Sequence, residues 1–224
     1  MSATVSILAL WVAFAGTHIA LSSLSLRAKL VQSIGDKGFL GLFSVVALAI
    51  FIPLVAVYAH NKHAGSFLWY WGGIPAIRHS VYLGQGLAFS LIVGGNLTPS
   101  PASLASRPGS SEVRGVLRIT RHPLLMGVGL FGALHLLVAR VHTSDLIFFA
   151  GLPAFALLGC WHQDRRKLAS LGDSFRRFHS ETTFLPFARG GFRGLAEARV
   201  AVGVAIAAAF LLRYFHPSLF GGSP

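Results

Sequence analysis

Residues 3–23 read ATVSILALWVAFAGTHIALSS and contain no Lys, Arg, Asp or Glu. A bilayer core of about 30 Å needs about 20 mostly apolar residues when a helix crosses it. The segment therefore predicts a transmembrane helix. No Lys or Arg precedes it, so the basic region that opens a secretory signal peptide is missing. We expect the segment to remain as the first membrane helix.

Further apolar segments follow along the chain, at 39–59, 79–97, 123–140, 145–162 and 198–215. Helices are favoured because a spanning segment must satisfy its own backbone hydrogen bonds. The composition agrees, since 54% of residues are hydrophobic and 12% are charged, against about 25% charged in a soluble domain. The predicted fold is an all-α, polytopic membrane bundle of about six transmembrane helices, with residues 1–224 as one domain.

The charge pattern predicts an orientation. The formal net charge is +12, and most of the 19 Lys and Arg fall in the first, third and fifth connections. By the positive-inside rule these connections are cytoplasmic. We expect a bacterial inner-membrane protein with periplasmic termini and lipid as its surroundings. Topology accounts for the charge, so no nucleic-acid partner is expected. The single Cys160 excludes an intramolecular disulfide.

The longest polar stretch includes DRRKLASLGDSFRRFHSET at 164–182. Leu168, Leu171, Phe175 and Phe178 recur at helical spacing against a basic face, which predicts an amphipathic helix. Two interpretations remain open. The helix lies on the anionic cytoplasmic leaflet, or it packs against the ends of the bundle.

His18 and His135 fall inside predicted membrane helices. An ionisable group at membrane depth is expensive and is by default a candidate for function. Imidazole is a common metal ligand, so the pair suggests axial ligation of a haem iron. Counted from Arg27 and Arg121, the two side chains lie about 13 Å and about 21 Å from the cytoplasmic face, an offset that long side chains tolerate. The alternative is that each histidine only hydrogen-bonds a neighbouring helix.

Residues 127–132 read GVGLFG, a formal match to a dinucleotide-binding motif. We reject that interpretation because no strand precedes it. Gly129 and Gly132 either offer a smooth face to a flat cofactor or allow another helix to approach closely.

Arg121, His122 and Pro123 start the fourth predicted helix, where the helix dipole favours a carboxylate or phosphate. Arg27, Arg165 and Arg166 stand at predicted cytoplasmic helix ends, where they bind an acidic group such as a haem propionate or act only as orientation anchors. Asp164 is expected to pair with an arginine.

Four stretches together resemble the NnrU family: GTHIALSSLSLRAKL (16–30), GLFSVVAL (41–48), LRITRHPLLMGVGLFGALHLL (117–137) and DRRKLASLGDSFRRFHSETTFLPFA (164–188). That family includes the 15-cis-zeta-carotene isomerases of plants and cyanobacteria. The resemblance implies a polytopic membrane protein that binds haem b, with His18 and His135 as axial ligands. In the isomerase a cysteine three residues before the second histidine is proposed as an alternate ligand. Gly132 stands there in this chain, so such a ligand switch is not expected.

The resemblance implies two kinds of role. One is a haem-dependent cis–trans isomerase acting on an apolar polyene, in which His18 and His135 are the catalytic groups. The other is a role in denitrification, in nitrite or nitric oxide reduction, that senses or relays electrons from an unknown donor. A more distant likeness, carried by Arg121, His122, Pro123 and Gly127, runs to membrane methyltransferases that use S-adenosylmethionine. Leu125 and Gln163-Asp164 depart from that pattern and argue against methyl transfer.

Overall fold

The computed structural model describes residues 2–103 and 112–220, and in these residues the chain is almost wholly helical. Each of the predicted apolar segments forms a helix, which confirms the all-α membrane bundle. The long helices are α1 (Ala3–Ser22), α2 (Leu24–His60), α3 (Pro75–Leu97), α4 (Pro123–Val138), α5 (Thr143–Leu171) and α8 (Arg199–Phe220). The short elements are β1 (Phe67–Trp69), η1 (Gly115–Arg118), β2 (Val141–His142), α6 (Asp173–Glu181) and α7 (Arg193–Glu197).

By length and composition, α1, α2, α5 and α8 could each cross a membrane. Between 6% and 33% of the residues in their most apolar windows are buried, so the bundle fully encloses only a minority of these side chains. Such a surface is suited to lipid rather than water. The apolar α4 has 16 residues and a length of about 24 Å, and it is enclosed by α3 and α5 instead.

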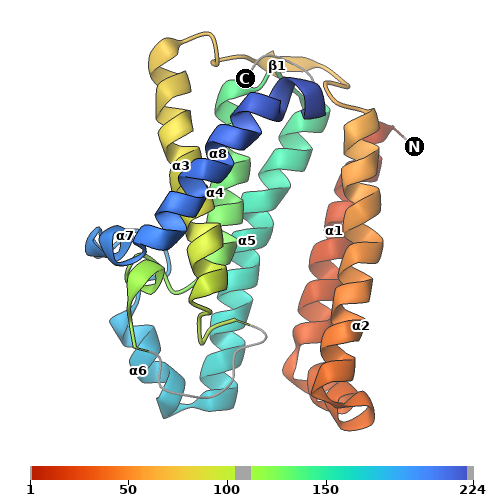
Figure 1. Ribbon diagram of the computed structural model, residues 1–224. Helices are drawn as coiled ribbons and strands as arrows, with labels where there is room; N and C mark the ends of the chain where they lie inside the picture. The colour runs from red at the N-terminus through yellow and green to blue at the C-terminus, as the bar shows by residue number, and fades with distance from the viewer. Residues whose placement is uncertain (1, 104–111, 221–224) are drawn as a thin grey trace.

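The long helices run up and down, and both termini lie at the same end of the bundle (Figure 1). Helices α3, α4 and α5 pack side by side, α8 covers α3, and the α1–α2 hairpin packs on α5. One apolar core joins the hairpin to α5 and is centred on Ile7, Trp11, Leu54 and Phe148. This arrangement makes α5 the element shared by the two halves of the bundle.

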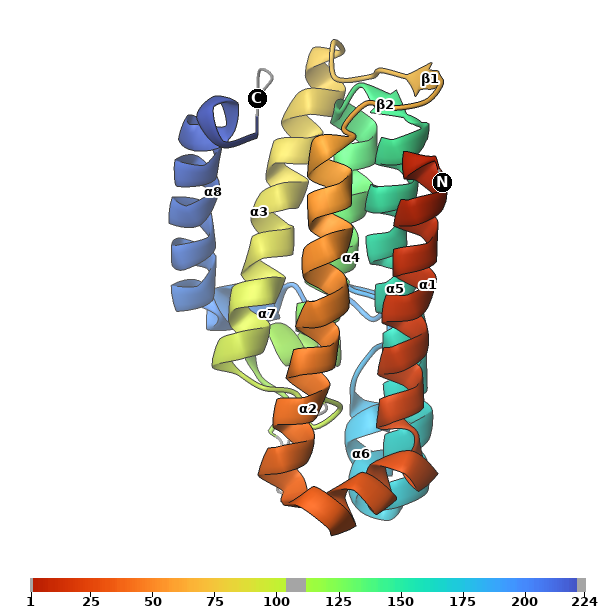
Figure 2. The ribbon, with the colours of Figure 1, turned by 90° about the vertical axis from the view of Figure 1, so that its right-hand side faces the viewer.

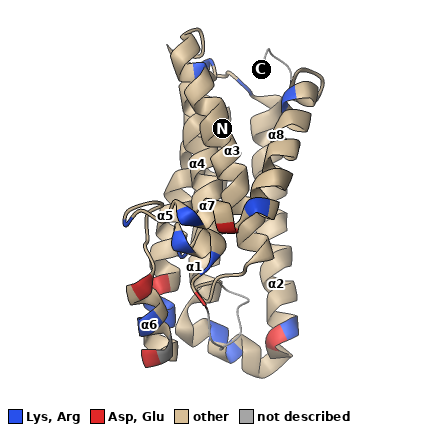
Figure 3. Ribbon diagram, turned by 60° about the vertical axis from the view of Figure 1, so that its left-hand side comes forward, with Lys and Arg blue, Asp and Glu red and all other residues tan. Residues whose placement is uncertain are grey.

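The first connection contains an unpredicted stretch of helix. Helix α2 begins at Leu24, before the predicted apolar span, and its backbone breaks at Gly35, where φ is 73°. Glycine tolerates this left-handed conformation, which other residues rarely adopt. The residues before the break lie across the lower end of the molecule (Figure 2). Lys and Arg gather there and around α6 and α7 (Figure 3).

The glycines of GVGLFG serve close helix packing. A Cβ on Gly127 would stand 2.7 Å from the carbonyl oxygen of Ala88 in α3. Cβ atoms on Gly129 and Gly132 would stand 3.0 Å from Ala156 Cβ and 2.6 Å from Leu152 Cβ, both in α5. Gly129 and Gly132 were predicted to line a cofactor, but α5 covers their faces. Helix packing, the alternative from the sequence, is what these glycines permit.

The predicted amphipathic helix divides at Gly172, where φ is 54°. The following helix, α6, buries Phe175 and Phe178 in a cluster with Ala102 and Leu117. Of the two interpretations of this segment, the structure supports packing against the bundle end.

Candidate functional site

His18 lies on α1 beside a small cavity. Its ring contacts Phe14, Phe43 and Phe155, with centroid separations of 4.1, 4.8 and 5.1 Å. Its Nδ1 is 2.8 Å from the carbonyl oxygen of Phe14. The cavity has a volume of about 220 Å³ and is lined by His18, Ile19, Ser22, Phe43, Leu125, Phe155, Leu158, Gly159, His162 and Gln163. One imidazole therefore borders a mostly apolar space between four long helices, α1, α2, α4 and α5.

His135 lies on α4 in a tighter setting. Its ring stacks on Phe149 of α5 at a centroid separation of 4.7 Å and an interplanar angle of 11°. Its Nδ1 is 2.8 Å from the carbonyl oxygen of Phe131 and 3.1 Å from Nε2 of Gln85 in α3. On α8, His216 is close enough to interact with it electrostatically.

The two histidines have the same local geometry but different surroundings. In each, Nδ1 faces the carbonyl oxygen one turn earlier, so a proton there leaves Nε2 as the nitrogen available for a metal. Among the described residues, the two imidazoles share no ring contact and no hydrogen-bond partner. Their α5 neighbours, Phe155 and Phe149, are about 9 Å apart along the helix axis. The offset is similar to the one expected from the sequence.

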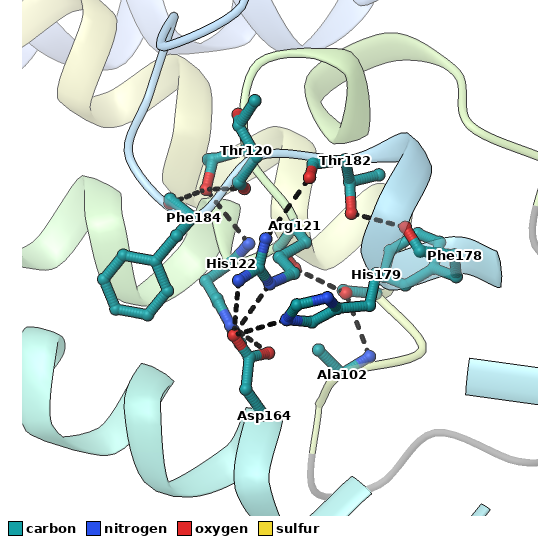
Figure 4. Close-up of polar contacts among 11 residues, drawn as sticks. Ala102, Thr120, Arg121, His122, Asp164, Phe178, His179, Thr182 and Phe184 are labelled. Atoms are coloured by element: carbon teal, nitrogen blue, oxygen red, sulfur yellow. Dashed lines mark hydrogen bonds and ion pairs between the residues drawn. The ribbon is translucent and has the colours of Figure 1, made fainter. Parts of the chain in front are cut away.

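The RHP sequence forms a buried ionic centre at the opposite end of α4 (Figure 4). Arg121 donates from Nε and Nη2 to Oδ2 of Asp164, at 2.8 and 2.6 Å. Nε2 of His122 is 2.9 Å from the other carboxylate oxygen. The three side chains are at most 9% exposed. The expected pairing of Asp164 with an arginine is confirmed, and the partner is Arg121. The acid suited to this helix start is supplied by the chain itself.

The TTFLPFA segment holds this centre in place. The backbone N–H of Arg121 donates to the carbonyl oxygen of Thr183 at 2.9 Å. The hydroxyl of Thr183 donates to the carbonyl oxygen of Ile119 at 2.9 Å, and that of Thr120 to the carbonyl oxygen of Phe184 at 2.7 Å. Sequence reasoning did not assign these threonines a role. The sequence offered one indication of that role, because RITRHP and TTFLPFA both contributed to the family resemblance.

Two further groups join the ionic centre. The hydroxyl of Ser100 donates to the carbonyl oxygen of Arg121 at 2.6 Å. His179 of α6 places Nε2 at 3.7 Å from Asp164 Oδ2. The sequence carried no signal for either residue, because both reach the centre from other segments of the chain.

A second cationic group lies beside the His18 cavity, and it lacks an equivalent acid. We call Arg27, His162 and Arg166 the cationic rim. Arg166 is 5% exposed, and its Nε and Nη2 have no hydrogen-bond partner among the described residues. The same holds for Arg27 Nε and His162 Nε2. Arg27 has a distant contact, 3.7 Å, with the exposed Asp36.

The two arginines of the cationic rim are close enough to repel one another. Arg166 interacts electrostatically with both His162 and Arg27. A buried cation is normally paired, so the rim is suited to an anionic group from outside the chain. Arg165, also predicted to bind an acidic group, is instead exposed and lies over the ring of Trp161 at 4.9 Å.

Comparisons with known proteins point in one direction. The family model described as NnrU protein matches residues 6–224. Among curated proteins, the chain is similar to 15-cis-zeta-carotene isomerase, chloroplastic, of Arabidopsis thaliana, with 28% identity over 84% of this chain and 50% of that protein. The Zea mays protein of the same name is 25% identical over 82% of this chain and 50% of its own length. The chain thus spans about half the length of these relatives.

No solved structure matches the chain significantly. The family assignment therefore depends on sequence, and the match covers nearly the whole chain from α1 to α8. The ionic centre, both interior histidines and the cationic rim all lie within the matched residues. The chain belongs to the NnrU protein family.

Proposed function

We propose that this protein is a membrane isomerase that acts on a cis double bond of an apolar polyene, using haem b. The observation that carries the proposal is the similarity to the two carotene isomerases over more than four fifths of this chain. The apolar surface that the bundle does not enclose supports it, because a hydrocarbon substrate would reach the protein through the lipid.

Three features around His18 support a haem site there. Its Nδ1 faces a backbone carbonyl, which orients the ring and raises its basicity as a ligand. Phe43, Phe155 and Leu158 provide an apolar wall that excludes water. The unpartnered nitrogens of Arg166 and Arg27 are suited to the two propionate carboxylates.

His135 is the expected second ligand, from α4, although it does not line the His18 cavity. Haem b, when bound, would supply an electron-dependent Lewis acid or redox partner for the polyene. The chain's own part is to hold the iron through imidazole nitrogen, to keep the site dry and to neutralise the propionates with the cationic rim.

The first experiment is the visible absorption spectrum of the purified protein in its oxidised and reduced forms. Bis-histidine ligation predicts a sharp Soret band and low-spin reduced peaks. His18→Ala and His135→Ala should each abolish or shift them. His79→Ala is the matched control, because its Nδ1 also faces a carbonyl one turn earlier but its side chain is exposed. Unchanged spectra in both ligand variants would refute the assignment.

The second experiment tests the reaction. The protein is expressed in a host that accumulates 9,15,9′-tri-cis-zeta-carotene, and the isomers are separated by chromatography. Loss of the 15-cis isomer with the wild type, and its persistence with His18→Ala, would support the proposal. A normal haem spectrum without isomerisation would instead favour the electron-relay role and reject this substrate class.

A further inference from the structure

Two imidazoles and a carboxylate converge at the end of the bundle that carries both termini, away from the haem residues. They are His63 in the turn after α2, His142 in β2 and Asp145 in the first turn of α5. Their ligand atoms all lie within 4.8 Å of one another. The β1–β2 pairing joins the two segments, which are far apart in the sequence.

Both imidazoles present the same nitrogen to the same two oxygens. Nδ1 of His63 is 3.0 Å from Asp145 Oδ2 and 3.0 Å from the carbonyl oxygen of Arg140. Nδ1 of His142 is 3.7 Å from the same carboxylate oxygen and 3.2 Å from the same carbonyl oxygen. Two nitrogens and two oxygens thus lie close together, each nitrogen within 3.7 Å of both oxygens.

These separations match the spacing between ligands around a small divalent ion. Zn²⁺ binds imidazole nitrogen and carboxylate oxygen at about 2.0–2.2 Å in a tetrahedron, whose edges are then about 3.3 Å. The four measured distances range from 3.0 to 3.7 Å. Two histidines and one carboxylate also form a known type of zinc ligand set.

The cluster is held in position before any ion binds. Asp145 is fully buried, and its carboxylate accepts hydrogen bonds from the Tyr58 hydroxyl at 3.0 Å and the His142 backbone N–H at 2.8 Å. Such bonds orient a ligating carboxylate. His63 has φ of 58°, a conformation that is unfavourable for a residue with a side chain and persists only where its surroundings enforce it.

An ion from solution could reach this position. The side chain of His63 is 51% exposed and that of His142 is 22% exposed, so the open side of the cluster faces outward. We propose that His63, His142 and Asp145 bind one divalent transition-metal ion, with Zn²⁺ as the leading candidate and the Arg140 carbonyl as a fourth ligand. The ion ties the loop after α2 to the turn before α5.

The test uses the full chain purified in detergent and stripped with a chelator. Equilibrium dialysis against Zn²⁺ followed by elemental analysis should give one ion per chain, and added Zn²⁺ should raise the unfolding temperature. His63→Ala and His142→Ala should each weaken binding at least 100-fold, and the double variant should abolish it. These sites are chosen because Asp145 variants risk misfolding through loss of the Tyr58 bond.

Two controls separate this site from the haem site. His60→Ala removes an exposed histidine at the end of α2 and should leave Zn²⁺ affinity unchanged. His18→Ala should also leave it unchanged while altering the haem spectrum. Absence of stoichiometric binding by the wild type, or equal binding by the double variant, would overturn the proposal and leave the cluster as a hydrogen-bonded turn.

Discussion

Asp164 and Arg166 stand two residues apart on α5 and are similarly buried, but cationic neighbours neutralise the first and repel the second. Asp164 is 6% exposed and is neutralised by Arg121 and His122. Arg166 is 5% exposed, and two of its guanidinium nitrogens have no partner among the described residues. A buried ion pair satisfies both of its charges, whereas an unsatisfied buried cation is costly unless a group from outside the chain pairs with it. The comparison separates a structural centre from a candidate ligand site on the same helix.

The largest expected effect comes from Asp164→Asn. It leaves Arg121 and His122 facing a neutral amide in a buried site, and the free energy of unfolding should fall by about 3–5 kcal/mol. Thermal unfolding in detergent measures this. Asp173→Asn is the matched control because its side chain is 93% exposed, and it should change the free energy by less than about 0.5 kcal/mol. Equal effects of the two substitutions on the free energy of unfolding would contradict the structural role assigned to Asp164.

Arg166→Met should act in the opposite direction on the ligand-free protein. Methionine occupies a similar space without a charge, so the free energy of unfolding should rise by about 1–3 kcal/mol, while haem retention during gel filtration should fall. Arg165→Met, at the exposed neighbouring position, should change neither quantity appreciably. If Arg166→Met destabilised the ligand-free protein as strongly as Asp164→Asn, the contrast between the two positions would be wrong.

Ser100→Ala tests how far the ionic centre depends on the segment after α3. The substitution removes the 2.6 Å bond to the carbonyl oxygen of Arg121 and leaves a buried acceptor unsatisfied. The expected loss is about 1–2 kcal/mol in the free energy of unfolding. Ser44→Ala is the control, because its hydroxyl bonds within its own helix and is exposed. A loss no greater than that of Ser44→Ala would show that the Ser100 hydroxyl does not stabilise the ionic centre.

The smallest effect concerns His179. Burial lowers its pKa below the ordinary 6.5, and Arg121 lowers it further, although Asp164 opposes both. The unfolded chain therefore binds more protons at this group than the folded chain does. The contribution of neutral His179 to the free energy of unfolding is therefore complete above about pH 6.5, and it is lost as the pH falls below that value. The unfolding temperature, followed from pH 7.5 to pH 5, should fall less in His179→Ala than in the wild type. An identical pH profile would contradict this.

Much of the fold was predictable, and the reason is local. Runs of about 20 apolar residues can be satisfied in a bilayer only as helices, so each predicted segment became one. The start of α2 was missed because LSLRAKLVQSIGDKG has polar residues and no membrane-length apolar run. Its helix depends on the turn at Ser23 and the break at Gly35. The prediction that α6 packs on the bundle end or on lipid could not be decided locally, since Phe175 and Phe178 suit either surface.

The candidate sites were only partly predictable. His18 and His135 were selected by their chemistry, because an imidazole in an apolar run is conspicuous. An arginine partner for Asp164 was expected. Its identity as Arg121 depends on how the start of α4 packs against α5, because the two residues are 43 positions apart in the sequence. The histidines of the proposed zinc site lie near the ends of apolar segments, and no sequence pattern singled them out. Nothing in their spacing reveals that a pair of short strands brings His63 to Asp145.

The order of apolar and basic residues by itself determined that this chain forms a bundle of membrane helices with two imidazoles inside apolar segments, and its sequence motifs placed it in the NnrU family. A membrane helix is specified by the hydropathy of consecutive residues, so the sequence is enough to predict it. The tertiary structure alone decided which charges are neutralised, which cations lack a partner, which glycines are covered by helices and which histidines share a carboxylate. Those properties depend on atoms that meet within about 4 Å after distant segments have packed, and such distances are set by the fold.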